Sequence, residues 1–126
     1  MDKLNFEFKN NVALTDLQKM NPALIIVLGY ASYFCNLSNL PCLITSIFDE
    51  AIGRQTDTHR EGRAFDISVR NWGKEDIEEF IDFMNRRVGY LGAISNSDGK
   101  QRVVVYHKVK GNEYHLHAQV NRNPKI

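Results

Sequence analysis

Hydrophobic and polar positions recur along this chain with two periods, and each period predicts one kind of element. Apolar residues three and four positions apart favour a helix over residues 15–36 and a second helix over residues 74–88. The second helix has acidic residues in its first turn and basic residues in its last, which suits the helix dipole, and Gly89 is expected to end it. Its apolar stripe consists of Ile77, Phe80, Ile81, Met84 and Val88.

Pro22 complicates the first helix. Proline lacks a backbone N–H and has a restricted φ, so two arrangements are open. Either Pro22 kinks a helix that begins at an N-cap at Thr15 or Asp16, or it occupies the first turn of a separate helix that starts after Asn21.

The β-prone segments are short. Residues 4–8 alternate between apolar and polar, residues 42–48 form a continuous β-prone run, and residues 63–69 follow a polar loop at 49–58. Because side chains alternate between the faces of a strand, two sets are expected along residues 63–69. Phe65, Ile67 and Val69 share one face, while Ala64, Asp66 and Ser68 share the other.

The C-terminal third predicts a hairpin. After a turn at residues 96–99, residues 101–109 and 114–120 are expected to pair across residues 110–113, and a polar tail follows at 121–126. The order of helices and strands indicates an α+β domain, with a mostly antiparallel sheet and helices packed on one face.

Composition narrows the class of protein. The 126 residues predict a single domain, 1–126, and are expected to form a monomer. A net charge of +1 gives no electrostatic footprint for nucleic acid. The N-terminus lacks a signal-peptide pattern and the apolar run 23–28 is too short for a transmembrane segment, so a cytoplasmic product is expected. Cys35 and Cys42 are expected to be unpaired thiols, with a Cys-x6-Cys metal pair as the alternative.

Candidate metal ligands occur in two places. His115 and His117 are two residues apart on a predicted strand and therefore point to the same face. Asp66 lies on another strand, His59 precedes it by seven residues, and Ala64 is small enough to leave room beside Asp66. Two imidazoles, a carboxylate and one water are the ligands of a catalytic zinc, which lowers the pKa of that water to about 7. The alternative is a pair of surface histidines and a solvated His59.

The candidate metal ligands belong to a sequence motif that resembles one in a known family. His59-x-x-Gly62-x-Ala64-x-Asp66, followed downstream by His115-x-His117, resembles the zinc D-alanyl-D-alanine carboxypeptidase and L-alanyl-D-glutamate endopeptidase family of cell-wall peptidases. The same fold group includes the signalling domain of Hedgehog proteins. The resemblance spans about residues 43–120 and implies a Hedgehog/DD-peptidase fold. Small members of this kind are common in bacteriophages, where they act as lysis enzymes (endolysins).

The resemblance implies a role for each residue. The zinc ligands would be His59, Asp66 and His117, and His115 would be a second imidazole near the metal or a catalytic one. Glu113 would be the general base, although it precedes His117 by four residues, where many carboxypeptidase members have an offset of three. The alternative for Glu113 is a solvated residue of the hairpin turn.

Other residues complete the expected cleft. Arg54 matches the family's arginine in the preceding loop, which would hold a substrate carboxylate or stabilise the oxyanion; otherwise it is solvated. Asp57 could accept a hydrogen bond from His59 or merely cap a loop. Ser46, Tyr106 and His107 are further candidates for the cleft lining.

The implied function is zinc-dependent hydrolysis of peptide bonds in bacterial peptidoglycan, by a carboxypeptidase or an endopeptidase. Such a protein would act on the cell wall after release from the cytoplasm, or be carried in a phage particle. The alternative is a non-catalytic, zinc-containing binding module or a virion component with the same fold.

Overall fold

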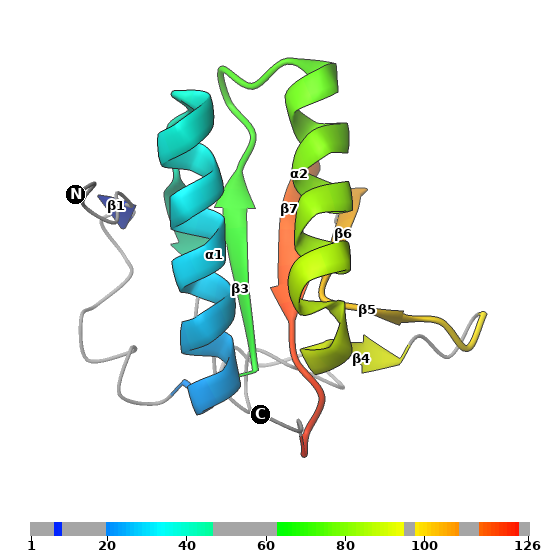
Figure 1. Cartoon of the computed structure of the whole chain (residues 1–126). Helices are drawn as coiled ribbons and strands as arrows, with labels where there is room; N and C mark the ends of the chain where they lie inside the picture. The colour runs from blue at the N-terminus through cyan, green and yellow to red at the C-terminus, as the bar shows by residue number, and fades with distance from the viewer. Residues whose placement is uncertain (1–6, 9–19, 47–62, 95–97, 109–113, 124–126) are drawn as a thin grey trace.

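Two helices lie on one face of a five-stranded sheet in the computed structural model (Figure 1). The structure describes residues 7–8, 20–46, 63–94, 98–108 and 114–123, and the statements below concern these residues. The helices are α1 (Pro22–Ser38) and α2 (Lys74–Val88). The strands of the sheet are β1 (Glu7–Phe8), β2 (Leu43–Ser46), β3 (Ala64–Ser68), β6 (Val104–Lys108) and β7 (Tyr114–Gln119).

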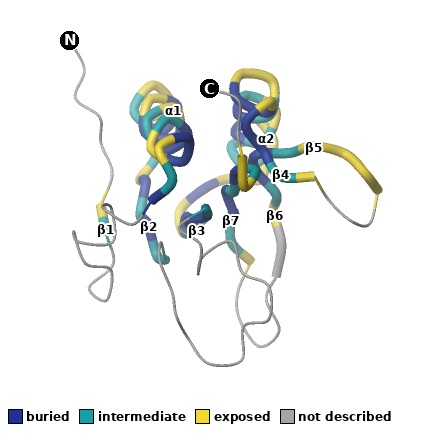
Figure 2. Tube along the Cα trace, turned by 90° about the horizontal axis from the view of Figure 1, so that it is seen from below, coloured by how far each residue is buried: buried dark blue, intermediate teal, exposed yellow. Residues whose placement is uncertain are grey.

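The sheet is mixed, with the strand order β1-β2-β3-β7-β6. β1 runs parallel to β2, whereas the pairs β2–β3, β3–β7 and β6–β7 are antiparallel. Seen from below, α1 and α2 lie side by side on the same side of this row of strands (Figure 2). The predicted α+β class, with a mostly antiparallel sheet and helices on one face, is therefore confirmed.

The first helix starts at the proline. Pro22 occupies the first turn, and the Oδ1 atom of Asn21 caps the helix by accepting a hydrogen bond from the backbone N of Ala23 at 2.9 Å. Met20 and Asn21 precede the helix, so a continuous helix over residues 15–36 is wrong and the separate helix after Asn21 is correct. The N-caps expected at Thr15 or Asp16 lie outside the described residues.

The second helix covers residues 74–88, as predicted. The side chain of Asp76 accepts a hydrogen bond from the backbone N of Gly73 at 2.8 Å, which satisfies one donor at the N-terminus. Gly89 ends the helix, as predicted, with a right-handed φ of −58°. The chain continues into a short 3-10 turn, η2 (Gly89–Leu91).

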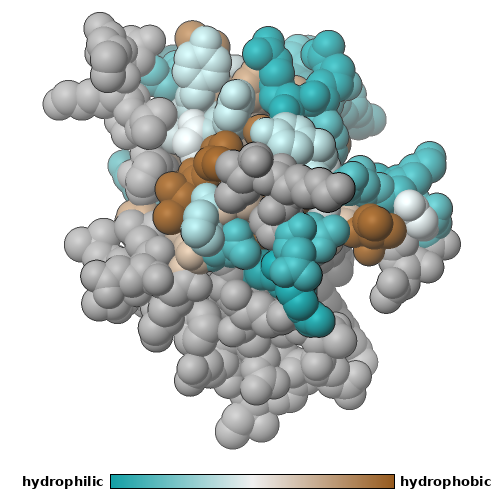
Figure 3. All heavy atoms as spheres, turned by 60° about the horizontal axis from the view of Figure 1, so that its bottom comes forward, coloured by the Kyte–Doolittle hydropathy of each residue, from teal (hydrophilic) through white to brown (hydrophobic). Residues whose placement is uncertain are grey.

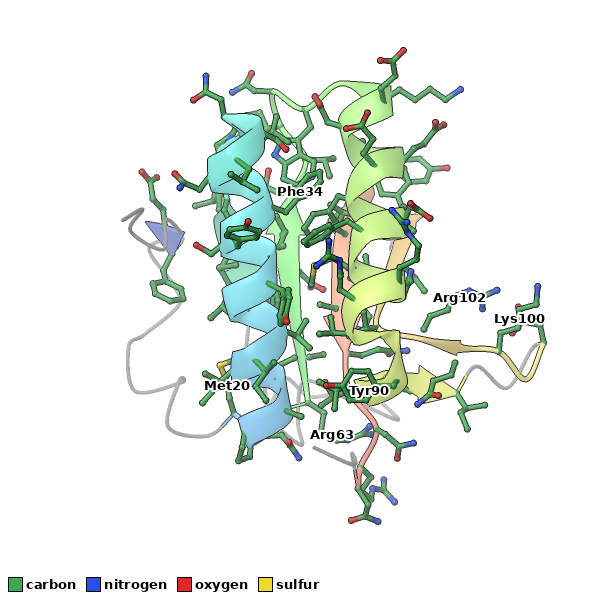
Figure 4. All side chains as sticks on the ribbon, in the orientation of Figure 1. Met20, Phe34, Arg63, Tyr90, Lys100 and Arg102 are labelled. Atoms are coloured by element: carbon green, nitrogen blue, oxygen red, sulfur yellow. The ribbon has the colours of Figure 1, made fainter. Side chains whose placement is uncertain are left out.

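The core lies between the helices and the sheet. Phe65 and Ile67 point from β3 toward the helices and are fully buried. Phe34 points from α1 toward α2 (Figure 4), where its ring meets the ring of Phe80 edge-on at 5.3 Å between centroids. Trp72 also packs edge-on against Phe80, and its Nε1 atom donates a hydrogen bond to the backbone O of Pro41 at 2.9 Å.

None of the described helices is both long enough and apolar enough to cross a bilayer. On the face shown in Figure 3, the described apolar side chains form small separate areas.

The predicted strand 101–109 is interrupted at Val103. Its first part, β5 (Gln101–Arg102), pairs with β4 (Ala93–Ile94), a strand that the sequence pattern did not predict. Only the second part, β6, pairs with β7. The hairpin of β4 and β5 carries Lys100 and Arg102 away from the helices (Figure 4), and a Cβ atom at Gly92 would lie 2.2 Å from the backbone O of Arg102.

Candidate metal centre

Three potential metal ligands meet on the sheet face opposite the helices. Asp66 in β3 pairs directly with His117 in β7, and Ser68 pairs with His115. The residues that alternate with these ligands along the two strands are apolar and buried in the core. They are Phe65 and Ile67 in β3 and Leu116 and Ala118 in β7. Because apolar side chains take the helix-covered face, Asp66, His115 and His117 must share the other face.

The separations between the potential ligand atoms can be compared with those around a tetrahedrally coordinated cation. The Oδ1 atom of Asp66 lies 2.9 Å from Nδ1 of His117 and 3.6 Å from Nε2 of His115. One ligand atom from each of the three residues lies within 4.8 Å of the others. Ligand bonds of 2.0–2.1 Å in a tetrahedral zinc site imply about 3.3 Å between neighbouring ligand atoms. The two separations from Asp66 bracket that value. The third separation, between the two histidine atoms, is within 4.8 Å and would have to approach about 3.3 Å for the three residues to form three corners of a zinc site.

Burial makes the charge of the Asp66 carboxylate costly unless the cluster compensates it. Asp66 and His117 each retain only 8% of their accessible surface. A buried carboxylate is costly unless a positive charge or hydrogen-bond donors compensate it. Nδ1 of His117 lies at hydrogen-bonding distance from Asp66, and a divalent cation held between the three residues would compensate the carboxylate in place of a proton on that nitrogen. Two nitrogens and one oxygen suit zinc and also other divalent transition metals.

The structure brings together part of the predicted site. Asp66, His115 and His117 converge as expected from strand alternation. The other predicted residues, His59, Arg54, Glu113 and Asp57, lie outside the described residues, and their roles remain predictions.

Two of the three further candidates for the cleft have backbone positions beside this cluster. Ser46 pairs with Asp66 across β2 and β3, and His107 pairs with His115 across β6 and β7. Tyr106 pairs with Leu116, which places it on the helix-covered face. The expectation that Tyr106 lines the cleft is therefore wrong. On the helix-covered face, the ring of Tyr106 stacks on the ring of Tyr114, with 5.0 Å between centroids.

The sequence interpretation missed Gln119. Its Oε1 atom lies 3.1 Å from Nε2 of His117, the ring nitrogen opposite the one that faces Asp66. The same period of two that relates His115 to His117 places Gln119 on their face. Strand alternation alone could therefore have identified it.

The cysteines do not form a metal pair with these ligands. Cys35 and Cys42 are free and buried, as expected for unpaired thiols. A hydrogen bond with Cys42, together with burial, raises the pKa of the Cys35 thiol far above its usual range. Among the residues that the structure describes, the cluster of potential metal ligands contains Asp66, His115 and His117 and neither cysteine.

No protein-family model matches the chain, and no curated protein or solved structure matches it. The resemblance to zinc cell-wall peptidases therefore rests on the motif residues. The geometry above supports metal binding by three of those residues, independently of any relative.

Proposed function

We propose that this protein is a zinc-dependent peptidase that hydrolyses peptide bonds in bacterial peptidoglycan. The observation that carries the proposal is the buried cluster of Asp66, His115 and His117, whose ligand atoms lie within 4.8 Å of one another. A mostly antiparallel sheet with helices on one face is compatible with the Hedgehog/DD-peptidase fold that the motif implies. Because small members of that group in bacteriophages act as lysis enzymes, the proposal includes a role in phage lysis.

Each residue has a proposed task. Asp66 and His117, with His59 by resemblance, hold the cation, and the negative charge of Asp66 offsets part of the cation's charge. A bound zinc would supply Lewis-acid polarisation of the scissile carbonyl and of a water. Glu113 takes the proton of that water as general base and passes it to the leaving amine.

Two more residues serve substrate binding and the oxyanion. Arg54 holds a substrate carboxylate or stabilises the oxyanion. His115 is close enough to Asp66 to act beside the cation, either as a proton carrier or as an oxyanion donor.

One distance favours a second candidate function. His115 Nε2 lies 3.6 Å from Asp66 Oδ1, which is close to the separation of about 3.3 Å expected of two ligands on one zinc ion. If His59, Asp66, His115 and His117 all bound the ion, the tetrahedron would be closed and no position would remain for water. The protein would then be a zinc-containing binding module, or a virion component, without turnover.

Metal content and wall cleavage test the main proposal together. The purified protein should carry zinc and should release free amino groups from isolated peptidoglycan; a chelator should abolish that release and added zinc should restore it. Asp66→Asn should lose zinc and cleavage, because a neutral amide is a poor zinc ligand. Asp82→Asn is the matched control, since Asp82 is exposed on α2 and pairs with Arg86 away from the site. Zinc-loaded protein that releases no amino groups from several wall chemotypes would refute the peptidase.

His115→Ala separates the two candidates. In a peptidase with an open zinc position, this variant should keep its zinc and lose activity. In a binding module with a closed site, His115→Ala should weaken zinc binding, and the wild-type protein should sediment with peptidoglycan without cleaving it.

A further inference from the structure

Gln119 is the last residue of β7 and lies on the same sheet face as the metal-ligand cluster. Its backbone N donates a hydrogen bond to the backbone O of Val103 at 2.8 Å, and its register partner in β3 is Ala64. These backbone contacts fix its position along the strand. The side chain extends toward the ring of His117, where Oε1 lies 3.1 Å from Nε2.

The two nitrogens of the His117 ring therefore have different surroundings. Nδ1 faces Oδ1 of Asp66 at 2.9 Å, on the side where the cation would lie, and Nε2 faces the amide oxygen of Gln119. A histidine that binds a metal through one nitrogen carries its proton on the other. The hydrogen bond made by that second nitrogen decides which nitrogen is left for the metal.

His115 presents the opposite nitrogen to the cluster. Its Nε2 atom is the one at 3.6 Å from Asp66, whereas His117 uses Nδ1. The two histidines would thus bind one cation through different ring nitrogens. The Nδ1 mode at His117 requires an acceptor for Nε2–H, and Oε1 of Gln119 is positioned to be that acceptor.

We infer that Gln119 is a positioning residue that keeps the proton of His117 on Nε2 when a cation replaces the proton on Nδ1 beside Asp66, so that Nδ1 is the atom offered to the metal. The inference rests on metal binding within the proposed function, but not on peptidase activity. It also assigns the ligand atoms: Nδ1 from His117 and, where His115 binds, Nε2. Removing the acceptor should weaken zinc binding about 10- to 100-fold, as is usual when a partner of a metal-bound histidine is lost.

Two substitutions at Gln119 test the acceptor. Gln119→Leu has a similar size and no acceptor, so zinc affinity, measured by competition with a chromogenic chelator, should fall by about 10-fold or more. Gln119→Glu restores an acceptor oxygen and should bring the affinity back to the wild-type value or above it. Gln101→Leu is the matched control. It removes two hydrogen bonds to the backbone O atoms of Tyr90 and Gly92, which involve neither His117 nor Gln119, and it should leave the zinc affinity unchanged.

Nitrogen-15 NMR of the zinc-loaded protein reads the tautomer directly. Nε2 of His117 should show the chemical shift of a protonated nitrogen and Nδ1 that of a metal-bound one. Zinc affinity of Gln119→Leu equal to wild type, or zinc on Nε2 of His117, would overturn the inference while leaving the peptidase proposal intact. Zinc binding with the predicted tautomer but without wall cleavage would support the inference and refute the peptidase. A wild-type protein that binds no zinc would overturn both.

Discussion

The side chain of Asn85 on α2 satisfies three backbone groups where β5 ends and β6 begins. Its Oδ1 atom accepts hydrogen bonds from the backbone N atoms of Val103 at 2.7 Å and Val104 at 3.2 Å. Its Nδ2 atom donates to the backbone O of Val104 at 3.1 Å. Val103 and Val104 retain 0% and 1% of their accessible surface, so few waters could replace these bonds. Removing this side chain should therefore cost more than removing a typical polar residue.

Asn85→Ala should lower the free energy of unfolding by about 2–4 kcal/mol, because a buried backbone donor that loses its partner costs about 1–3 kcal/mol. The higher helix propensity of alanine offsets about 0.5 kcal/mol of that loss. At about 4 °C per kcal/mol for a chain of this length, Tm should fall by roughly 8–16 °C. Asn85→Asp keeps the acceptor and loses the donor, so its loss should be smaller.

Urea unfolding measures the change, followed by the fluorescence of Trp72, the single tryptophan, which is buried. The midpoint should fall while the slope of free energy against urea stays the same. Glu78→Ala, at an exposed position of the same helix, is the control and should change stability by less than about 0.5 kcal/mol. A loss below about 1 kcal/mol for Asn85→Ala would refute the view that Asn85 alone satisfies these groups.

Two further predictions concern titratable groups. Cys35 and Cys42 are buried, and the pKa of the Cys35 thiol is raised. Iodoacetamide at pH 8 should therefore modify neither thiol in the folded protein and both thiols in urea. Rapid modification of the folded protein would contradict the burial of the two thiols. The hydrogen bond from Arg102 lowers the pKa of the Asp98 carboxyl from 3.8 to about 2, so the contribution of this ion pair to stability is present above pH 3.8 and is lost as the pH falls toward 2. An NMR titration of Asp98 should give a midpoint near 2 that moves toward 3.8 in Arg102→Gln, and a wild-type midpoint near 3.8 would exclude the effect.

Local periodicity alone determined much of this protein. The apolar stripe and end charges of α2 predicted residues 74–88, and the alternation in β3 placed Asp66 on the face opposite Phe65 and Ile67. The His-x-His spacing placed His115 and His117 on one face for the same reason. These features could be predicted because each depends on neighbours within one or two turns of helix or a few residues of strand.

Only the tertiary structure decided the rest. The pairing of Asp66 with His117 joins residues 51 positions apart, and its register follows from burying the apolar residues of β3 and β7 under the same helices. At the break at Val103, the backbone N of Val103 bonds to Asn85 in α2, which is 18 residues away in the sequence. No pattern along residues 101–109 predicts this break. The two ring nitrogens of His117 face different partners, Asp66 and Gln119, and we infer that these contacts select the nitrogen left for a metal. Spacing can place a side chain on a face, but contacts across the sheet decide which of its atoms is left to react.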